Sequence, residues 1–396
     1  MKKLLTLILA VMLVMAAATG AFAEEGKFIV GAYTQMSGDK ATYGMEVKNN
    51  LEMAIEYINA NGGFNGAEVE LVMYDTQGSP EEAVKIAAKL VGSDHADAVI
   101  ASVNSNEVFA SGAFLNDAGV FTMGLGTSAS WMAEDWPYVF RASVNNDRTV
   151  PGTVAMIAEV GIPTVGCFYG QDDAAVSTWK AFCTECEANG IEVVSSETYD
   201  PTDTDYSAQI ANVLAKDPKS IYLSVSGDYG ALFMKQLREQ GFTGMIFAKE
   251  CVMQSQIQVA GVQAANYVAF AYPYVTYSSI EECNIPIMRE YLERYSEKYG
   301  ELPQTDSAYR AWDTMMIMWE ASKIAGANDS DSLKNAIETI SDYEGLGGTF
   351  DFTKGDREGL SRINAFVLYE GASVPFEEWV AAEGYEAYKA ATGNEF

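Results

Sequence analysis

The chain of 396 residues exceeds what one hydrophobic core usually serves, so two lobes are expected. Its formal net charge of −30 would repel nucleic acid and anionic membrane surfaces, which excludes both as favoured partners. With 48% apolar and 20% charged residues, the composition is that of an ordinary globular protein.

The N-terminal segment is expected to be separate from the fold. The start MKK is followed by an apolar run over residues 4–18 and by AFA at residues 21–23, the pattern of a secretory signal peptide. A transmembrane anchor is the alternative, but the run is shorter than the ~20 residues that span a bilayer. No cysteine follows the run, so lipid attachment is not expected there. We therefore expect export, with cleavage after Ala23 and Glu24 as the first mature residue.

Short β-rich runs alternate with amphipathic helical patterns along the rest of the chain. Strands are predicted over residues 27–33, 68–74, 98–102, 120–125, 165–169, 191–197, 221–225, 245–248, 267–271 and 365–369. Helices are predicted over residues 45–60, from 80 onward, and near 108–115, 150–160, 176–188, 206–215, 231–240, 286–299 and 309–325. Such alternation predicts an α/β fold of parallel, doubly wound sheets, and the number of units indicates two Rossmann-like lobes.

Three connections are candidates for the passage of the chain between the lobes. They lie at residues 143–147, at 271–277 and near 350–359. A hinge of three segments makes both lobes discontinuous. The predicted N-terminal lobe comprises residues 24–145 and 273–357, and the predicted C-terminal lobe comprises 146–272 and 358–396. Because ligands of open α/β sheets bind beyond the carboxyl ends of the strands, we expect the site between the lobes.

Polar side chains gather where the third and fourth predicted strands end. The sequence VNSN places Asn104 and Ser105 at the end of one strand and the start of a helix. The unpaired N–H groups and the positive dipole end of a helix favour an anion there. Gly126, Thr127 and Ser128 follow the next strand, so the two strand ends could together hold a carboxylate. Helix capping and a turn explain the same residues equally well, and the pattern leaves both alternatives open.

Glu250 ends the eighth predicted strand. A carboxylate that faces the cleft from this position could pair with the ammonium group of a ligand. The alternative is a surface acid on an acidic protein, and the position alone favours that alternative.

A catalytic or metal site has little support in the sequence. His95 is the single histidine and lies between acids in SDHAD, which indicates a surface loop. Cys183 and Cys186 lack the second ligand pair that a zinc site would need. Cys251 is a candidate nucleophile without a nearby histidine. We expect no enzymatic activity, no cofactor and no metal.

Two long stretches carry a family resemblance. VGAYTQMSGDKATYG at residues 30–44 and INANGGFNGAEVELVMYDTQGSPEEAV at 58–84 are similar to the opening of the periplasmic solute-binding proteins of the leucine/isoleucine/valine class. The spacing from NSNEVFASGAFLNDAG to GTSAS matches that class as well. The resemblance covers nearly all of the mature chain and implies the type I periplasmic binding protein fold.

The resemblance also implies roles for individual residues. It implies that Ser105, Ser128 and the backbone of Gly126 hold an α-carboxylate. It implies that Glu250 holds the α-ammonium group and that Tyr43 lines the cleft.

This chain departs from the family pattern at several positions. A family aromatic residue falls near Asp173 or Ala174, and a second falls near Ser226, for which Asp228 or Tyr229 could substitute. Asn104 stands where many relatives have a cysteine, and Gly78 stands where its disulfide partner would be, so that disulfide is expected to be absent. We therefore expect a more polar side-chain pocket than one built for leucine.

The function implied by the resemblance is delivery of an amino acid, of the branched-chain class or a more polar relative, to the membrane permease subunits of an ABC transporter. The protein would act in the periplasm as a monomer. Alternatives are a carboxylate without an amine or a small amide as the ligand, or a role as a ligand-sensing domain.

Overall fold

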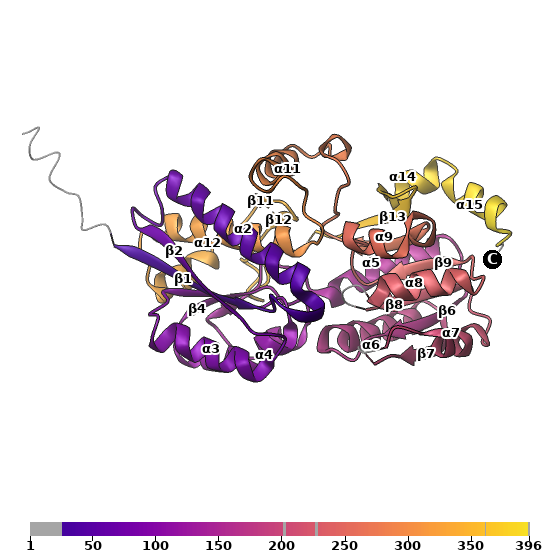
Figure 1. Ribbon diagram of the computed structural model, residues 1–396, viewed down its shortest axis with the longest axis horizontal. Helices are drawn as coiled ribbons and strands as arrows, with labels where there is room; N and C mark the ends of the chain where they lie inside the picture. The colour runs from indigo at the N-terminus through magenta and orange to yellow at the C-terminus, as the bar shows by residue number, and fades with distance from the viewer. Residues whose placement is uncertain (1–25, 201–202, 226–228, 361, 395–396) are drawn as a thin grey trace, which may run out of the picture.

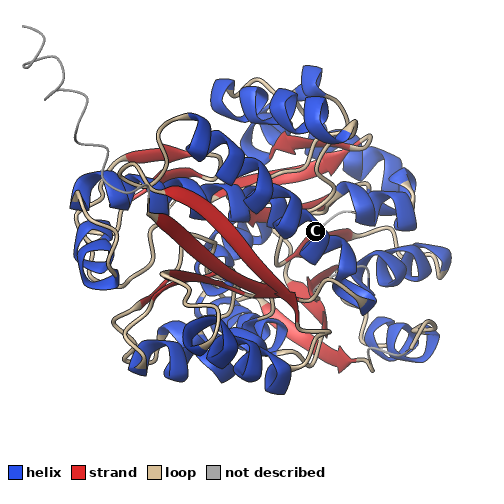
Figure 2. Ribbon diagram, turned by 60° about the vertical axis from the view of Figure 1, so that its left-hand side comes forward, coloured by secondary structure: helices blue, strands red, loops and turns tan. Residues whose placement is uncertain are grey.

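Two separate β-sheets organise the part of the chain that the computed structural model describes, which is residues 26–200, 203–225, 229–360 and 362–394. Figure 1 shows one lobe around each sheet: the first is indigo and purple together with the orange segment over residues 286–350, and the second runs from magenta to salmon and includes the yellow C-terminal segment. Figure 2 shows that helices flank the strands on both sides. The predicted signal peptide, residues 1–23, lies outside the described residues.

The first sheet contains five parallel strands in the order β2-β1-β3-β4-β5. They are β1 (Lys27–Thr34), β2 (Glu68–Asp75), β3 (Ala98–Ala101), β4 (Phe121–Gly124) and β5 (Val139–Phe140). β3 and β4 are buried along their whole length, as strands covered on both faces should be. The first four confirm the predicted strands, whereas β5 was not predicted because two residues are too few to show a β period.

The helices of the first lobe place several residues at the carboxyl edge of this sheet. They are η1 (Gly38–Lys40), α2 (Ala41–Ala60), α3 (Pro80–Gly92), α4 (Ser105–Asp117) and η2 (Ser130–Met132). A Cβ atom added to Gly44 would lie 1.9 Å from the carbonyl oxygen of Gln35. Glycine therefore allows the start of α2 to pack against the segment that follows β1, and this contact fixes the position of Gln35.

The second sheet contains seven strands in the order β14-β13-β10-β9-β8-β6-β7. They are β6 (Thr164–Tyr169), β7 (Glu192–Thr198), β8 (Ser220–Ser224), β9 (Met245–Ala248), β10 (Val268–Tyr272), β13 (Asn364–Tyr369) and β14 (Ala372–Pro375). β13 pairs antiparallel with both β10 and β14, so this edge departs from the predicted parallel arrangement. A crossover helix within one lobe would make β13 parallel to its neighbour. The chain instead reaches β13 from the other lobe, so the strand can run in either direction.

Helices from two parts of the chain complete the second lobe. They are α5 (Asn146–Glu159), α6 (Asp173–Ala188), α7 (Ser207–Leu214), α8 (Tyr229–Glu239), α9 (Gln254–Ala260), α10 (Val262–Ala265), α14 (Phe376–Ala381) and α15 (Gly384–Thr392). Among the described residues, no helix is both long and apolar enough to cross a membrane.

The segment between β10 and β13 returns to the first lobe. It forms η3 (Ile280–Glu282), α11 (Pro286–Tyr299), α12 (Ser307–Ala325), α13 (Ser330–Ile337), β11 (Tyr343–Gly345) and β12 (Gly348–Phe350). The hydroxyl of Tyr291 on α11 donates to Oδ1 of Asn50 on α2 at 2.7 Å, and α12 packs along α2. The predicted lobe boundaries fall in the connections that follow β5, β10 and β12, and they stay a prediction.

Two of these connections lie side by side. The N–H of Arg141 donates to the carbonyl of Arg357 at 2.9 Å, and the N–H of Gly359 donates to the carbonyl of Arg141 at 3.0 Å. Nη2 of Arg141 lies 2.9 Å from Oε2 of Glu358, and the two side chains form a buried ion pair. The N–H groups of Nη2 do not point at this oxygen, so the contact is not a hydrogen bond. Nη1 of the same guanidinium donates to the carbonyl of Ser128 at 2.6 Å. Arg141 thus joins the hinge to the loop that follows β4.

All five cysteines are free thiols, and Cys183 alone among them is half-buried and not buried. We predict that reduction of the exported protein with dithiothreitol leaves its free energy of unfolding unchanged, because no disulfide holds the native chain together. Denaturant unfolding with and without the reductant checks this. A loss of about 2–5 kcal/mol, which is typical of a structural disulfide, would contradict the prediction.

Candidate ligand-binding site

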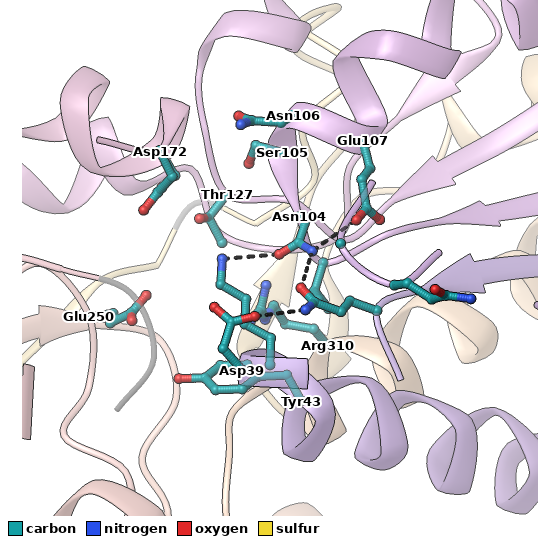
Figure 3. Close-up of a pocket in the computed structure, with 16 residues that line it drawn as sticks. Asp39, Tyr43, Asn104, Ser105, Asn106, Glu107, Thr127, Asp172, Glu250 and Arg310 are labelled. Atoms are coloured by element: carbon teal, nitrogen blue, oxygen red, sulfur yellow. Dashed lines mark hydrogen bonds between the residues drawn. The ribbon is translucent and has the colours of Figure 1, made fainter. Parts of the chain in front are cut away.

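A cavity of about 280 Å³ lies where the two lobes face each other. The described residues that line it are Gln35, Asp39, Lys40, Tyr43, Gln77, Gly78, Val103, Asn104, Ser105, Asn106, Glu107, Thr127, Asp172, Ala174, Glu250 and Arg310. Figure 3 shows Glu250 and Asp172, from the second lobe, facing the residues of the first lobe. The cavity therefore has a polar wall on each side.

Two hydroxyl groups reach the cavity from neighbouring strand ends. Ser105 is the first residue of α4, and its Oγ accepts a hydrogen bond from the N–H of Ser128 at 3.0 Å. Thr127 follows β4, and its Oγ1 accepts from Nδ2 of Asn146 at 3.1 Å. Each hydroxyl oxygen is thus occupied as an acceptor and keeps its own proton for a ligand oxygen. Together with the N–H groups at the start of α4, these two hydroxyls form a carboxylate cradle, a set of donors that can hold a carboxylate.

Side-chain capping does not account for the polar cluster. Asn104 is the N-cap residue of α4, yet its side chain makes no hydrogen bond to the helix backbone. Its Oδ1 accepts from Nζ of Lys40 at 3.0 Å, and its Nδ2 donates to Oε1 of Gln35 and Oε1 of Glu107, each at 3.0 Å. Asn104 therefore belongs to a side-chain network in the cavity wall.

Gly126 and Ser128 are adjacent to this carboxylate cradle but do not line the cavity. A Cβ atom at Gly126 would lie 2.9 Å from Oγ of Ser105, so glycine leaves room for that hydroxyl. Oγ of Ser128 donates to Oγ of Ser130 at 3.0 Å. Contact of Gly126 and Ser128 with a ligand stays a prediction.

Glu250 follows β9 and presents an unsatisfied oxygen at the opposite side. The residue is 7% exposed, and among the described residues its Oε1 has no hydrogen-bond partner. Its Oε2 lies 3.6 Å from Nζ of Lys249. Burial raises the pKa of the Glu250 carboxyl above its ordinary value, with Asp306 and Asp172 adding to this effect against Lys249 and Arg310. A buried carboxylate oxygen without a donor costs free energy, so this position suits a ligand that brings an N–H group.

Other predicted site residues make contacts between the lobes. The hydroxyl of Tyr43, on α2, donates to Sδ of Met253 at 3.2 Å. Asp173 does not line the cavity; its N–H donates to Oδ1 of Asn106 at 3.3 Å, and its carboxylate accepts from the hydroxyl of Ser130.

The predictions for the second family aromatic position are only partly described. Ser226 and Asp228 lie outside the described residues. Tyr229, which we considered as a substitute, donates through its hydroxyl to Oδ2 of Asp39 at 2.9 Å. The predicted ligand contacts of Ser226 and Asp228 stay predictions.

Several charged residues that line the cavity were not predicted from the sequence. Asp39 and Lys40 lie in the stretch TQMSGDKATYG, just before Tyr43, and this proximity was the available signal. Arg310 had no local signal, because it reaches the cavity on α12 from a distant part of the chain. Its Nη1 donates to the carbonyl of Leu125 at 2.7 Å, and its Nη2 pairs with Asp306 at 2.9 Å.

The described residues that line the cavity include no histidine and no cysteine. Among the described residues, no cluster of three or more histidine, cysteine, aspartate or glutamate side chains could hold a metal ion. His95 is exposed on a surface loop, as predicted. Burial raises the pKa of the Cys251 thiol well above its ordinary value, so the side chain stays an unreactive thiol.

Comparisons with known proteins agree with this architecture. The periplasmic binding protein family matches residues 28–370. An amino acid binding protein from Pseudomonas aeruginosa is 23% identical over 370 residues, which cover 92% of this chain and 94% of that protein.

Two solved structures show the same fold. A leucine binding protein from Thermotoga maritima has a TM-score of 0.76 at 22% identity, with 88% of this chain and 97% of that chain covered. A solute binding protein of an ABC transporter from Rhodopseudomonas palustris, in complex with 3,4-dihydroxybenzoic acid, has a TM-score of 0.78 at 19% identity, with 86% and 93% covered. These comparisons confirm the predicted resemblance and fold. With most of its length matched, the chain belongs to the periplasmic binding protein family, which has the type I fold and is not a family of enzymes.

Proposed function

We propose that this periplasmic binding protein, the solute-binding component of an ABC transporter, captures an amino acid between its lobes and delivers it to a membrane permease. The observation that carries the proposal is that Glu250 lines the cavity with a buried oxygen, Oε1, that has no hydrogen-bond partner in the described part of the chain, while the hydroxyls of Ser105 and Thr127 are offered from the other side. A zwitterion matches both sides, because its ammonium group donates to the carboxylate and its carboxylate accepts from the hydroxyls.

The position of these groups on different lobes supports capture by closure. Ser105 and Thr127 belong to the first lobe, whereas Glu250 belongs to the second. A ligand that bonds to both lobes favours the conformation in which they are close together. Closure also excludes water, which strengthens each charge interaction. The cavity of about 280 Å³ is just below the usual range of ligand pockets, roughly 300–1,000 Å³, and so suits a small amino acid.

The test is to purify the protein without denaturation, identify any retained compound by mass spectrometry, and titrate the unliganded protein by calorimetry. The panel contains free amino acids together with the same compounds lacking the α-amine. We expect at least one amino acid to bind about a hundredfold more tightly than its amine-free analogue. Equal affinity for both members of every pair would overturn the proposal.

A carboxylate without an amine is the second candidate, because one solved structure of similar fold contains 3,4-dihydroxybenzoic acid. Such a ligand could use the hydroxyls of Ser105 and Thr127. It would leave Oε1 of Glu250 buried and unpaired, which is why we place it second. Benzoic acids in the same titration panel separate the two candidates.

A further inference from the structure

We propose that the cavity contains a subsite for a carbonyl-type oxygen, anchored by Lys40, so that the preferred amino acid has a side chain ending in a carboxamide or a carboxylate. This inference rests on the proposed function, since it assigns the part of the ligand that lies beyond its amino and carboxylate groups. It extends that function from a class of compounds to a side-chain chemistry.

The wall beside the carboxylate cradle is polar. Gln35, Asp39, Lys40, Gln77 and Glu107 line it, and among the described lining residues the nonpolar surface comes from Val103, Ala174, Gly78 and the ring of Tyr43. A branched apolar side chain enclosed here would remove water from these amides and charges without replacing their hydrogen bonds. The wall therefore disfavours a hydrocarbon side chain.

The hydrogen bonds within this wall occupy most of its polar atoms. Asn104 uses both N–H groups on Gln35 and Glu107. Nε2 of Gln35 donates to Oδ1 of Asp39 at 2.7 Å, and Oδ2 of Asp39 accepts from Tyr229. Oε2 of Glu107 accepts from the hydroxyl of Thr76 at 2.9 Å. The carboxylates of this network therefore already have donors.

The ammonium group of Lys40 has spare donor capacity. It carries three N–H groups, and among the described residues it has one hydrogen bond, to Oδ1 of Asn104 at 3.0 Å. Asp172, on the opposite lobe, caps α6 by accepting the N–H of Ala175 at Oδ1 at 3.0 Å. Against the effect of burial, the charges of Lys40 and Lys249 lower the pKa of the Asp172 carboxyl, so Lys40 also attracts this group through its charge. Two N–H groups of Lys40 can therefore donate to an acceptor inside the cavity, and in our proposal a side-chain oxygen of the ligand is that acceptor.

The charges of the cavity favour a carboxamide oxygen over a carboxylate oxygen in the ligand side chain. The described lining residues include four carboxylates, on Asp39, Glu107, Asp172 and Glu250, against the cations of Lys40 and Arg310. A further negative charge would be repelled by this excess, whereas a neutral carboxamide presents the same oxygen without it. We therefore place the carboxamide ahead of the carboxylate.

Isosteric ligands give the sharpest test. Asparagine, aspartate and leucine have nearly the same shape and differ in the terminal atoms of the side chain, and glutamine, glutamate and homoleucine form a longer set. By calorimetry, we expect the best carboxamide or carboxylate ligand to bind about ten- to a hundredfold more tightly than the hydrocarbon of the same set. Comparison within each set identifies which oxygen chemistry and which length the subsite takes.

Substitution of Lys40 connects the preference to this residue. Lys40→Met keeps a linear side chain but removes the ammonium group, and we expect it to weaken the preferred ligand about ten- to a hundredfold and the hydrocarbon ligand less than threefold. Lys48→Met is the matched control, because Lys48 is partly exposed on α2, pairs with Glu52 and does not line the cavity. Thermal unfolding confirms that each variant is folded.

Each contrary outcome has a distinct meaning. Tightest binding of leucine or homoleucine, with Lys40→Met equal to the parent, would overturn the subsite and leave amino-acid capture intact. An equal loss for all amino acids in Lys40→Met would also overturn it, since Lys40 would then act on closure and not on side-chain choice. Absence of binding by every amino acid would overturn the proposed function and the subsite together.

Discussion

Replacement of Glu250 by alanine should weaken binding of the cognate amino acid by about thirty- to several-thousand-fold, which corresponds to roughly 2–5 kcal/mol. The change leaves the ligand ammonium buried opposite a vacated position, with the hydroxyls of Ser105 and Thr127 still holding the carboxylate. Calorimetric titration of Glu250→Ala and Glu250→Gln measures the loss, after circular dichroism has shown that both variants fold.

Two further variants set the scale of this loss. Ser105→Ala should cost only about 1–3 kcal/mol of binding free energy, because the end of α4 and Thr127 still face the carboxylate. Glu239→Ala, which removes an exposed acid at the end of α8 in the same lobe, should bind like the parent. If both Glu250 variants bind within about twofold of the parent, Glu250 is not the partner of the ammonium group.

The pH dependence of binding provides an independent readout of Glu250. Burial raises the pKa of this carboxyl above its ordinary value of 4.5, and the protonated form cannot pair with an ammonium ion. Affinity of the parent should therefore fall as the pH is lowered through this raised pKa, at a higher pH than an ordinary glutamate would cause. Glu250→Gln should show no such fall, and a parallel decline in both proteins would assign the effect to another group.

Replacement of Arg141 by methionine should lower the free energy of unfolding by about 3–5 kcal/mol, because it leaves the buried carboxylate of Glu358 without its main opposite charge. The guanidinium is fully buried, lies 4.8 Å from the ring centre of Trp131 and bonds to the carbonyl of Ser128. Denaturant unfolding measures the change. Because the Ser128 contact fixes the loop that carries Thr127, ligand affinity should fall as well.

The controls separate charge burial from loss of packing. Arg141→Met combined with Glu358→Gln should recover part of the stability, since the unpaired charge is then removed. Arg362→Met alters an exposed side chain in the same hinge region and should change the free energy of unfolding by no more than about 0.5 kcal/mol. A loss below about 1 kcal/mol in Arg141→Met would show that the pair with Glu358 does not stabilise the hinge.

Local sequence patterns were sufficient for most strands, because a strand buried on both faces, such as Ala98–Ala101, is a continuous apolar run. They were insufficient for the edge of the second sheet, where the direction of β13 depends on a chain that returns from the other lobe. The direction of β13 is set by the path of the third connection between the lobes, and a short stretch of sequence does not reveal that path.

In the candidate site too, residues with a local sequence signal were predicted and residues placed by distant parts of the chain were not. Asn104, Ser105 and Glu250 were found because strand ends in this fold open toward the cleft. Which hydroxyl of the second strand end lines the cavity was not predictable, because Thr127 and Ser128 are adjacent and the turn decides between them. Arg310 was missed because it reaches the cavity on α12, far along the chain from the strand ends. It bonds to Leu125, which is 185 residues earlier in the sequence.

The hydrogen bonds that join the lobes directly also affect the empty protein. Tyr229 bonds to Asp39, and Asp173 bonds to Asn106 and Ser130, so these side chains link the lobes directly. Each such bond lowers the free energy of the shut conformation before a ligand arrives, so a larger fraction of empty molecules is already shut. Apparent affinity rises because less of the binding energy is spent on closure. The same bonds reduce the contrast between loaded and empty protein, and discrimination by a transporter that recognises the shut form becomes less strict.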